Sequence, residues 1–159
     1  MFNRQQIENE VIAKACQILD MDSPAARALL LGTMAQESVF GTYVRQMGGG
    51  PALGVFQMEP ATFHDILHNW LNYQPNIAAR LRAVWPELPG PERLVTDLLF
   101  AAVMCRLHYR RKTDPLPAAD DIPGLARYWK LHYNTLLGKG TEDEFVASFN
   151  RYVKGEVKK

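Results

Sequence analysis

The sequence predicts an all-α fold: a single compact domain of about seven helices over residues 1–159. Three observations lead to this prediction. Apolar residues recur at helical spacing along most of the chain, capping residues mark helix starts, and no segment shows a convincing strand alternation. The length of 159 residues fits one domain, and 47% hydrophobic with 22% charged residues is ordinary for a globular protein. Only residues 53–57 favour a very short β element.

The predicted helices follow one another with short connections. The first covers residues 4–20, where apolar residues repeat at helical spacing. The second starts at Ser23, an N-cap followed by a proline at the first helical position, and continues through an apolar run toward Gly41. Five further helices are expected at residues 60–72, 76–84, 92–111, 122–136 and 141–159.

The charge of the chain is nearly balanced, except at the C-terminus. The 18 Lys and Arg residues face 17 Asp and Glu residues, so the formal net charge is +1. Such a chain has no global attraction to nucleic acid or to an anionic membrane, and no apolar segment reaches the roughly 20 residues of a membrane-spanning helix. We expect a monomer with no nucleic-acid partner and no stable membrane insertion. The helix at 141–159 starts with a Thr141–Glu144 capping box and ends in basic residues. We interpret this basic end as a solvated helix end, with contact with a membrane surface as the alternative.

The N-terminus and the cysteines bear on where the chain is made. The first eight residues are polar and lack the apolar core of a signal peptide, so we expect no signal peptide and synthesis in the cytoplasm. The chain has two cysteines, too few for a disulfide-dense scaffold. We expect Cys16 and Cys105 to be buried free thiols.

Three short motifs lie at or near predicted helix ends. Glu37-Ser38 follows the apolar run of the second helix, Gly54-Val55-Phe56-Gln57-Met58 lies in a glycine-rich connection, and Tyr133-Asn134 lies near the end of the helix at 122–136. A carboxyl group with apolar neighbours loses solvation, which raises its pKa and leaves it protonated near neutral pH. Such a group can protonate a glycosidic oxygen. The alternative for Glu37 is an ordinary surface glutamate at a helix end.

The order and spacing of these motifs resemble the lysozyme-like lytic transglycosylase superfamily, which includes soluble lytic transglycosylases and goose-type lysozymes. The resemblance covers roughly residues 25–150. It implies a lysozyme-like domain that binds peptidoglycan glycan strands and cleaves the β-1,4 bond between N-acetylmuramic acid and N-acetylglucosamine, without cofactor or metal. Glu37 matches the catalytic acid, and the phenol of Tyr133 is expected to hydrogen-bond its carboxyl group. The residues implied in substrate binding are Ser38, Gly54, Phe56, Gln57, Met58, Tyr133 and Asn134.

Different activities stay open at this point. Lytic cleavage, the favoured one, needs a single carboxyl group, because the C6 hydroxyl of the muramyl residue attacks from within the substrate. Hydrolysis by a muramidase needs a second carboxylate to activate water, and its candidates are Glu59 and Asp65. An alternative of another class is a non-catalytic lysozyme-like protein that binds glycan or serves virion assembly.

The biological setting follows from the resemblance together with the N-terminus. A glycan-cleaving chain without a signal peptide is typical of phage enzymes, which a holin releases or a virion carries. We therefore expect a bacteriolytic endolysin or virion-associated enzyme that acts on the cell wall from the periplasm.

Three further features have simpler interpretations. His64 and His68 resemble a zinc-protease helix, but Asp65 stands where that motif has Glu and no third ligand is evident, so no metal is expected. Five aromatic residues are assigned mostly to the core, with sugar stacking as the alternative: Trp70, Tyr73, Trp85, Tyr128 and Trp129. A basic run is interpreted as a solvated helix end or a contact for anionic polymers: Arg106, Arg110, Arg111 and Lys112.

Overall fold

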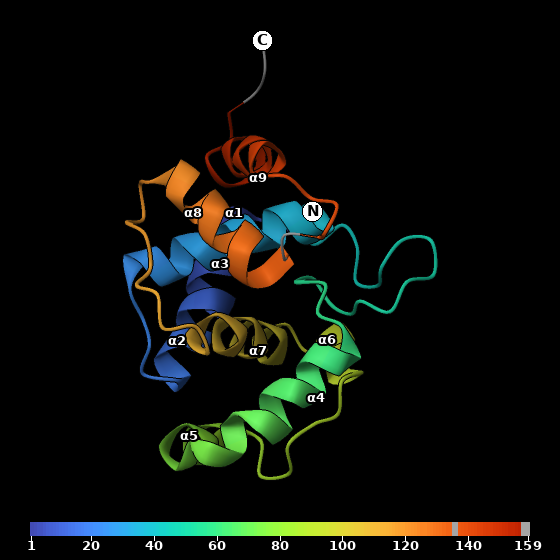
Figure 1. Cartoon of the computed structure of the whole chain (residues 1–159), viewed down its shortest axis with the longest axis vertical. Helices are drawn as coiled ribbons and strands as arrows, with labels where there is room; N and C mark the ends of the chain where they lie inside the picture. Colours follow the sequence, from blue (N-terminus) through green and yellow to red (C-terminus); the bar gives the residue numbers. More distant parts are fainter. Residues whose placement is uncertain (135–136, 157–159) are drawn as a thin grey trace.

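The computed structural model describes residues 1–134 and 137–156, and this part of the chain is predominantly helical (Figure 1). It contains no strand, so the predicted all-α fold class is confirmed. The α-helices in it are α1 (Arg4–Gln6), α2 (Ala13–Ile18), α3 (Pro24–Ser38), α4 (Pro60–Asn69), α5 (Pro75–Val84), α6 (Arg93–Thr96), α7 (Leu98–Arg110), α8 (Ile122–Trp129) and α9 (Glu142–Ser148). The other helical segments in it are the π-helical η1 (Ile7–Ile12), η3 (Lys130–Asn134) and η4 (Phe149–Val153) and the 3-10 turn η2 (Leu71–Tyr73).

Several predicted helices have the expected boundaries. Segments α1, η1 and α2 form one continuous helix over residues 4–18, close to the predicted 4–20. Ser23 caps α3, because its hydroxyl accepts a 3.0 Å hydrogen bond from the backbone N–H of Ala26. Helix α5 agrees with the predicted 76–84 within one residue. The helix expected at 60–72 divides into α4 and the separate turn η2.

The prediction of a single helix over residues 92–111 is wrong, because the helix is interrupted at Asp97. This residue has extended φ and ψ angles of −125° and 100°, which end α6. Its carboxylate accepts a 2.9 Å hydrogen bond from the backbone N–H of Phe100 and thereby caps α7. Asp favours such a cap over a helix interior, since its short side chain bonds a nearby backbone N–H.

The C-terminal helix begins as predicted but is shorter than the expected 141–159. Thr141 and Glu144 form the predicted capping box. The helix then ends at Val153. Gly155 has a φ of 73°, and the backbone N–H of Glu156 turns back to the carbonyl of Asn150 over 2.8 Å. A glycine in this left-handed conformation is a common helix stop. Lys158 and Lys159 of the predicted basic end lie outside the described residues, as do 135 and 136 of the helix predicted at 122–136.

The glycine-rich connection after α3 contains two isolated β-bridges in place of the short β element expected at 53–57. Leu53 pairs with Arg45 on one side and with Met58 on the other, both antiparallel. The second pairing has two backbone hydrogen bonds of 2.9 and 3.0 Å. These bonds close a tight turn that brings residues 54–57 together.

Helix α3 lies at the centre of the molecule. It contacts η1, α2, α7, α8, α9 and η4, and Figure 1 shows it between α8 and α9 on one side and α7 on the other. The buried hydrophobic side chains of all these elements form one contiguous core. Cys16 and Cys105 are buried free thiols in that core, as predicted. None of the helices in the described ranges is long and apolar enough to cross a membrane.

Candidate functional site

Glu37 lies in the last turn of α3, and the chain reverses direction directly after it. Val39, Phe40 and Gly41 all have left-handed backbone conformations, with φ of 52°, 51° and 80°. The hydroxyl of Ser38 donates to the carbonyl of Met34 over 3.1 Å and accepts from the N–H of Gly41 over 2.9 Å. These bonds close the helix end and fix the position from which the Glu37 side chain extends.

The Glu37 carboxyl group is partly buried and has one hydrogen-bond partner among the described side chains. The indole Nε1–H of Trp129 donates to Glu37 Oε1 over 2.8 Å. Burial raises the pKa of Glu37 from 4.5 to about 7, and the Trp129 hydrogen bond partly opposes that rise. With a pKa of about 7, Glu37 is about half protonated at neutral pH, and the protonated form is the state that a general acid requires.

Trp129 is a partner of Glu37 that the sequence prediction does not include, because the prediction assigns this residue to packing. It does pack: the indole is 1% exposed, and its centroid lies 5.4 Å from that of Phe145 on α9. The same indole also bonds Glu37 through its N–H. A signal for this was present in the sequence, because Trp129 precedes Tyr133 by four residues and such a pair shares one helix face.

Tyr133 lies near Glu37, but the expected hydrogen bond between its phenol and the Glu37 carboxyl group is not formed. The Tyr133 hydroxyl instead donates to the backbone carbonyl of Phe56 over 2.6 Å. Burial raises the pKa of Tyr133 well above its ordinary value, and the nearby Cys105 and Glu37 add to the rise.

The loop that holds Phe56 depends on Gly54. Gly54 is buried with a φ of 76°, and a Cβ atom there would lie 2.3 Å from the backbone oxygen of Leu94. Gln57, itself left-handed with a φ of 49°, donates to the Gly54 carbonyl through both its backbone N–H (3.0 Å) and its Nε2 (2.9 Å). Phe56 and Met58 are buried. Gln57 is thus the residue of this loop that remains partly exposed.

Ser38 and Asn134, both expected to bind substrate, serve the fold in this structure. Ser38 is fully buried and its hydroxyl closes the end of α3. The Asn134 side-chain oxygen accepts from the ammonium group of Lys130 over 2.8 Å. The same ammonium donates to the carbonyls of Gly138 (2.8 Å) and Gly140 (2.6 Å), so it holds the loop before α9.

The two candidates for a second carboxylate lie on α4 or at its start, and both are exposed. Glu59 is the residue before Pro60 and makes no side-chain cap bond to α4. Asp65 accepts from Asn69 over 2.6 Å and forms a 2.5 Å ion pair with Arg111. Hydrogen bonds from Asn69 and then Arg111 lower the pKa of Asp65. Arg111 of the basic run is therefore an ion-pair partner of α4.

The histidine pair of α4 does not form part of a recognisable metal centre. The rings of His64 and His68 stack with centroids 5.8 Å apart. Within residues 1–134 and 137–156, no group of three or more His, Cys, Asp or Glu side chains is arranged to hold a metal ion.

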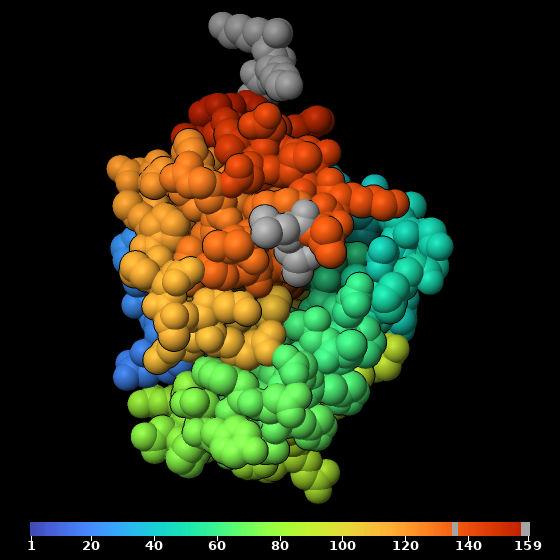
Figure 2. Space-filling model, viewed as in Figure 1, coloured from blue at the N-terminus to red at the C-terminus, as the bar shows by residue number. Residues whose placement is uncertain are grey.

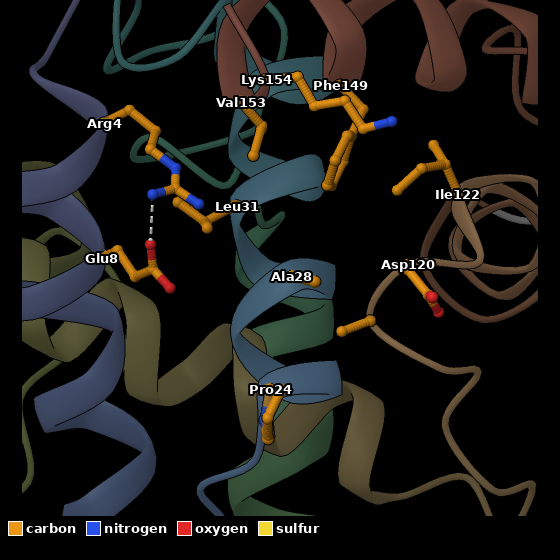
Figure 3. Close-up of a pocket in the computed structure, with 11 residues that line it drawn as sticks. Arg4, Glu8, Pro24, Ala28, Leu31, Asp120, Ile122, Phe149, Val153 and Lys154 are labelled. Atoms are coloured by element: carbon orange, nitrogen blue, oxygen red, sulfur yellow. Dashed lines mark ion pairs between the residues drawn. The ribbon is translucent and has the colours of Figure 1, made fainter.

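Two surface pockets lie away from Glu37. One has a volume of about 590 Å³, and Figure 3 shows Pro24, Ala28 and Leu31 of α3 lining it beside the Arg4–Glu8 ion pair. Ala28 and Glu37 are nine residues apart, which is two and a half helical turns, so they point to opposite sides of α3. The other, of about 770 Å³, lies between α4 and α5.

Residues from three parts of the chain thus meet around Glu37: the end of α3, α8 with η3, and α7. The loop at 53–58 is joined to η3 by the bond between Tyr133 and Phe56. On the face shown in Figure 2, the orange segment that contains η3 adjoins the green segment after the loop. Comparison of the chain with protein-family models, with curated proteins and with solved structures finds no match in any of the three.

Proposed function

We propose that this protein cleaves the β-1,4 bond between N-acetylmuramic acid and N-acetylglucosamine in peptidoglycan, with Glu37 as its catalytic carboxyl group. One observation carries the proposal. A carboxyl group at a helix end, partly buried and bonded to the Trp129 indole, has a pKa near 7. Enzymes use such a group to protonate a glycosidic oxygen at neutral pH. The motif resemblance adds the substrate class.

The chemistry requires one proton to leave Glu37 and one to return. Protonated Glu37 gives its proton to the glycosidic oxygen while the bond from that oxygen to C1 of the muramyl residue breaks. The resulting Glu37 carboxylate then takes the proton of the muramyl C6 hydroxyl as its oxygen bonds to C1. The product is a 1,6-anhydro sugar, and Glu37 ends protonated as it began.

The surroundings of Glu37 favour this one-carboxylate route over hydrolysis. A hydrolase needs a second carboxylate about 6.5–9.5 Å away for inversion, or about 5 Å away for retention. Such a charge close to Glu37 would raise its pKa further. Burial and the Trp129 bond are the influences on the pKa of Glu37, with no contribution from Glu59 or Asp65. Asp65 is moreover occupied by Arg111 and Asn69.

The proposed partner is the glycan strand itself, and the proposed place of action is the bacterial cell wall. A neutral glycan needs no strong basic field, which fits a formal net charge of +1. We propose a phage-type enzyme that reaches the wall by release to the periplasm or with a virion.

Mass spectrometry of the products from purified peptidoglycan tests the function. We expect anhydro-muropeptides from the wild-type protein and from Glu87→Gln, a matched change at an exposed glutamate. Glu37→Gln should give none while keeping its circular dichroism spectrum. Reducing muropeptides without the anhydro bridge would indicate a muramidase. Binding to peptidoglycan without any product would indicate the non-catalytic alternative, and wild-type cleavage by Glu37→Gln would exclude Glu37 as the acid.

A further inference from the structure

We infer that Trp129 is a positioning residue for Glu37: its indole N–H holds Oε1, so that the transferable proton of the carboxyl group resides on Oε2. The catalytic meaning of this inference rests on the proposed function, whereas its geometry does not. Trp129 lies at the end of α8 and Glu37 at the end of α3, 92 residues apart in the sequence.

The chemistry of the two groups assigns the proton. An indole nitrogen carries a hydrogen and has no acceptor site, so it can only donate. In the 2.8 Å contact, Glu37 Oε1 must therefore accept. In a protonated carboxyl group the carbonyl oxygen is a better acceptor than the hydroxyl oxygen, so the indole bond to Oε1 favours the form that carries the hydrogen on Oε2. The same contact also stabilises the carboxylate, since a hydrogen bond to the charged form favours it.

The indole is held in place from the side of α9. Its ring lies against Phe145, with a centroid distance of 5.4 Å. A Cβ atom built on Gly140 would lie 2.6 Å from Cη2 of Trp129, so the loop backbone closely approaches the ring at that point. Lys130 fixes this backbone through its bonds to the carbonyls of Gly138 and Gly140. The ring therefore has little room to turn its N–H away from Glu37.

No other group in the described part of the chain competes for the Glu37 carboxyl oxygens. The titratable groups close to it are Cys105 and Tyr109 on α7 and Tyr133 on η3, whose pKa values burial raises well above the ordinary range. All three are uncharged at neutral pH. The hydroxyl of Tyr109 bonds Thr33 over 2.7 Å, and that of Tyr133 bonds the Phe56 carbonyl.

Nuclear magnetic resonance of the wild-type protein tests the contact without any need for activity. The chain has three tryptophans, Trp70, Trp85 and Trp129, so three indole N–H resonances can be assigned by single Trp→Phe changes. We expect the Trp129 resonance to move with pH with a midpoint near 7, and this movement to disappear in Glu37→Gln. A Trp129 resonance that does not move near pH 7, or that moves equally in Glu37→Gln, would overturn the inference.

Trp129→Phe tests the effect on the acid itself. Phenylalanine keeps an aromatic ring against Phe145 but removes the donor. The pKa of Glu37, followed by carbon-13 resonance of its carboxyl group, should rise. If the protein cleaves peptidoglycan, the alkaline limb of its pH profile should move to higher pH and kcat should fall with little change in KM. An unchanged Glu37 pKa in a folded variant would contradict the positioning role. If the wild-type protein does not cleave peptidoglycan at all, the proposed function is refuted, but the inferred contact between Trp129 and Glu37 is not.

Gly140→Ala tests the loop that holds the ring, with Gly90→Ala as its matched control. A Cβ atom on Gly90 meets nothing within 4 Å, and neither glycine has a left-handed φ. We expect Gly140→Ala to shift the Trp129 indole resonance and to move the titration midpoint of Glu37, and Gly90→Ala to change neither. An unshifted Trp129 resonance in Gly140→Ala would show that the loop does not position the indole.

Discussion

The hydroxyl of Tyr133 is joined to the backbone carbonyl of Phe56 by a 2.6 Å hydrogen bond that spans 77 residues of sequence. This bond connects η3 to the loop at 53–58 beside Glu37. It also gives the Phe56 carbonyl a side-chain donor in a largely buried place. The Tyr133 phenol, which the motif suggested as a hydrogen-bond partner of Glu37, therefore connects η3 to the loop at 53–58.

Tyr133→Phe removes the hydrogen bond between η3 and the loop at 53–58. The Phe56 carbonyl loses its side-chain donor, so we expect a loss of about 1–3 kcal/mol in the free energy of unfolding and a lower rate of glycan cleavage. Tyr128→Phe is the control, because its hydroxyl also donates to a backbone carbonyl, that of Asp114, over 2.9 Å. Urea unfolding and turnover on purified peptidoglycan measure both effects. Equal cleavage rates in the two variants would argue against a role of the Tyr133–Phe56 hydrogen bond in cleavage.

The stability of the protein should depend on pH through Glu37. The pKa of Glu37 is about 7 when folded and about 4.5 when exposed, so the folded state binds the proton more tightly. This contribution to stability is fully present below pH 4.5 and is lost as the pH rises through about 7. The Glu37→Gln variant has no ionisable group at this position, so its stability lacks this dependence on pH.

The melting temperature of the wild type, relative to that of Glu37→Gln, should accordingly fall between pH 4.5 and pH 8. The difference corresponds to at most about 3 kcal/mol, and partial exposure of the side chain reduces it. Calorimetry over this pH range measures it, with Glu87→Gln as a reference for an exposed glutamate. A pH-independent difference between wild type and Glu37→Gln would mean that Glu37 titrates normally.

Gly54→Ala should be strongly destabilising because two costs add at this residue. A left-handed conformation costs an alanine about 1–2 kcal/mol, and the contact with the Leu94 backbone oxygen adds about 1–3 kcal/mol. Gly49→Ala isolates the first cost, since Gly49 has a φ of 81° and open space around it. Denaturant unfolding of the two variants gives the difference. Similar values would show that the loop moves freely away from Leu94.

Neither Glu59 nor Asp65 should be needed for cleavage. We expect Glu59→Gln and Asp65→Asn to release anhydro-products at rates within a few-fold of the wild type, because Glu37 alone supplies and recovers the proton. The same mass analysis of muropeptides reads out both variants. A loss of turnover in either one of more than about a hundredfold, the scale of a removed acid or base, would favour the hydrolytic alternative.

Local chemistry made several helix boundaries predictable from the sequence. The Ser23 cap and the Thr141–Glu144 box are each formed by residues within three positions of one another, and both are present in the structure. The break at Asp97 and the stop at Gly155 are equally local, and the prediction overlooked them by following apolar spacing across Asp97 and basic composition past Gly155.

The candidate site was predictable only in part, because its contacts join distant segments. The apolar surroundings of Glu37 follow from the run of α3, and they predict the direction of its pKa. The choice of Trp129 rather than Tyr133 as its partner depends on how α8 and η3 pack against the end of α3 and the loop at 53–58, which no short motif specifies. The internal bonds of Ser38 likewise depend on how the chain turns after α3.

The left-handed turn of the backbone directly after α3 affects which parts of the chain are needed to form the site around Glu37. Val39 and Phe40 both adopt a left-handed conformation that costs a non-glycine residue about 1–2 kcal/mol, and for the β-branched Val39 it is an outlier. Burial of the Phe40 ring in the core offsets that cost in the folded protein. A peptide of α3 alone has no such compensation and would leave Glu37 in a fraying, hydrated end. The raised pKa of Glu37 therefore depends on the whole folded domain, and grafting the Glu37 motif onto another helix would not transfer it.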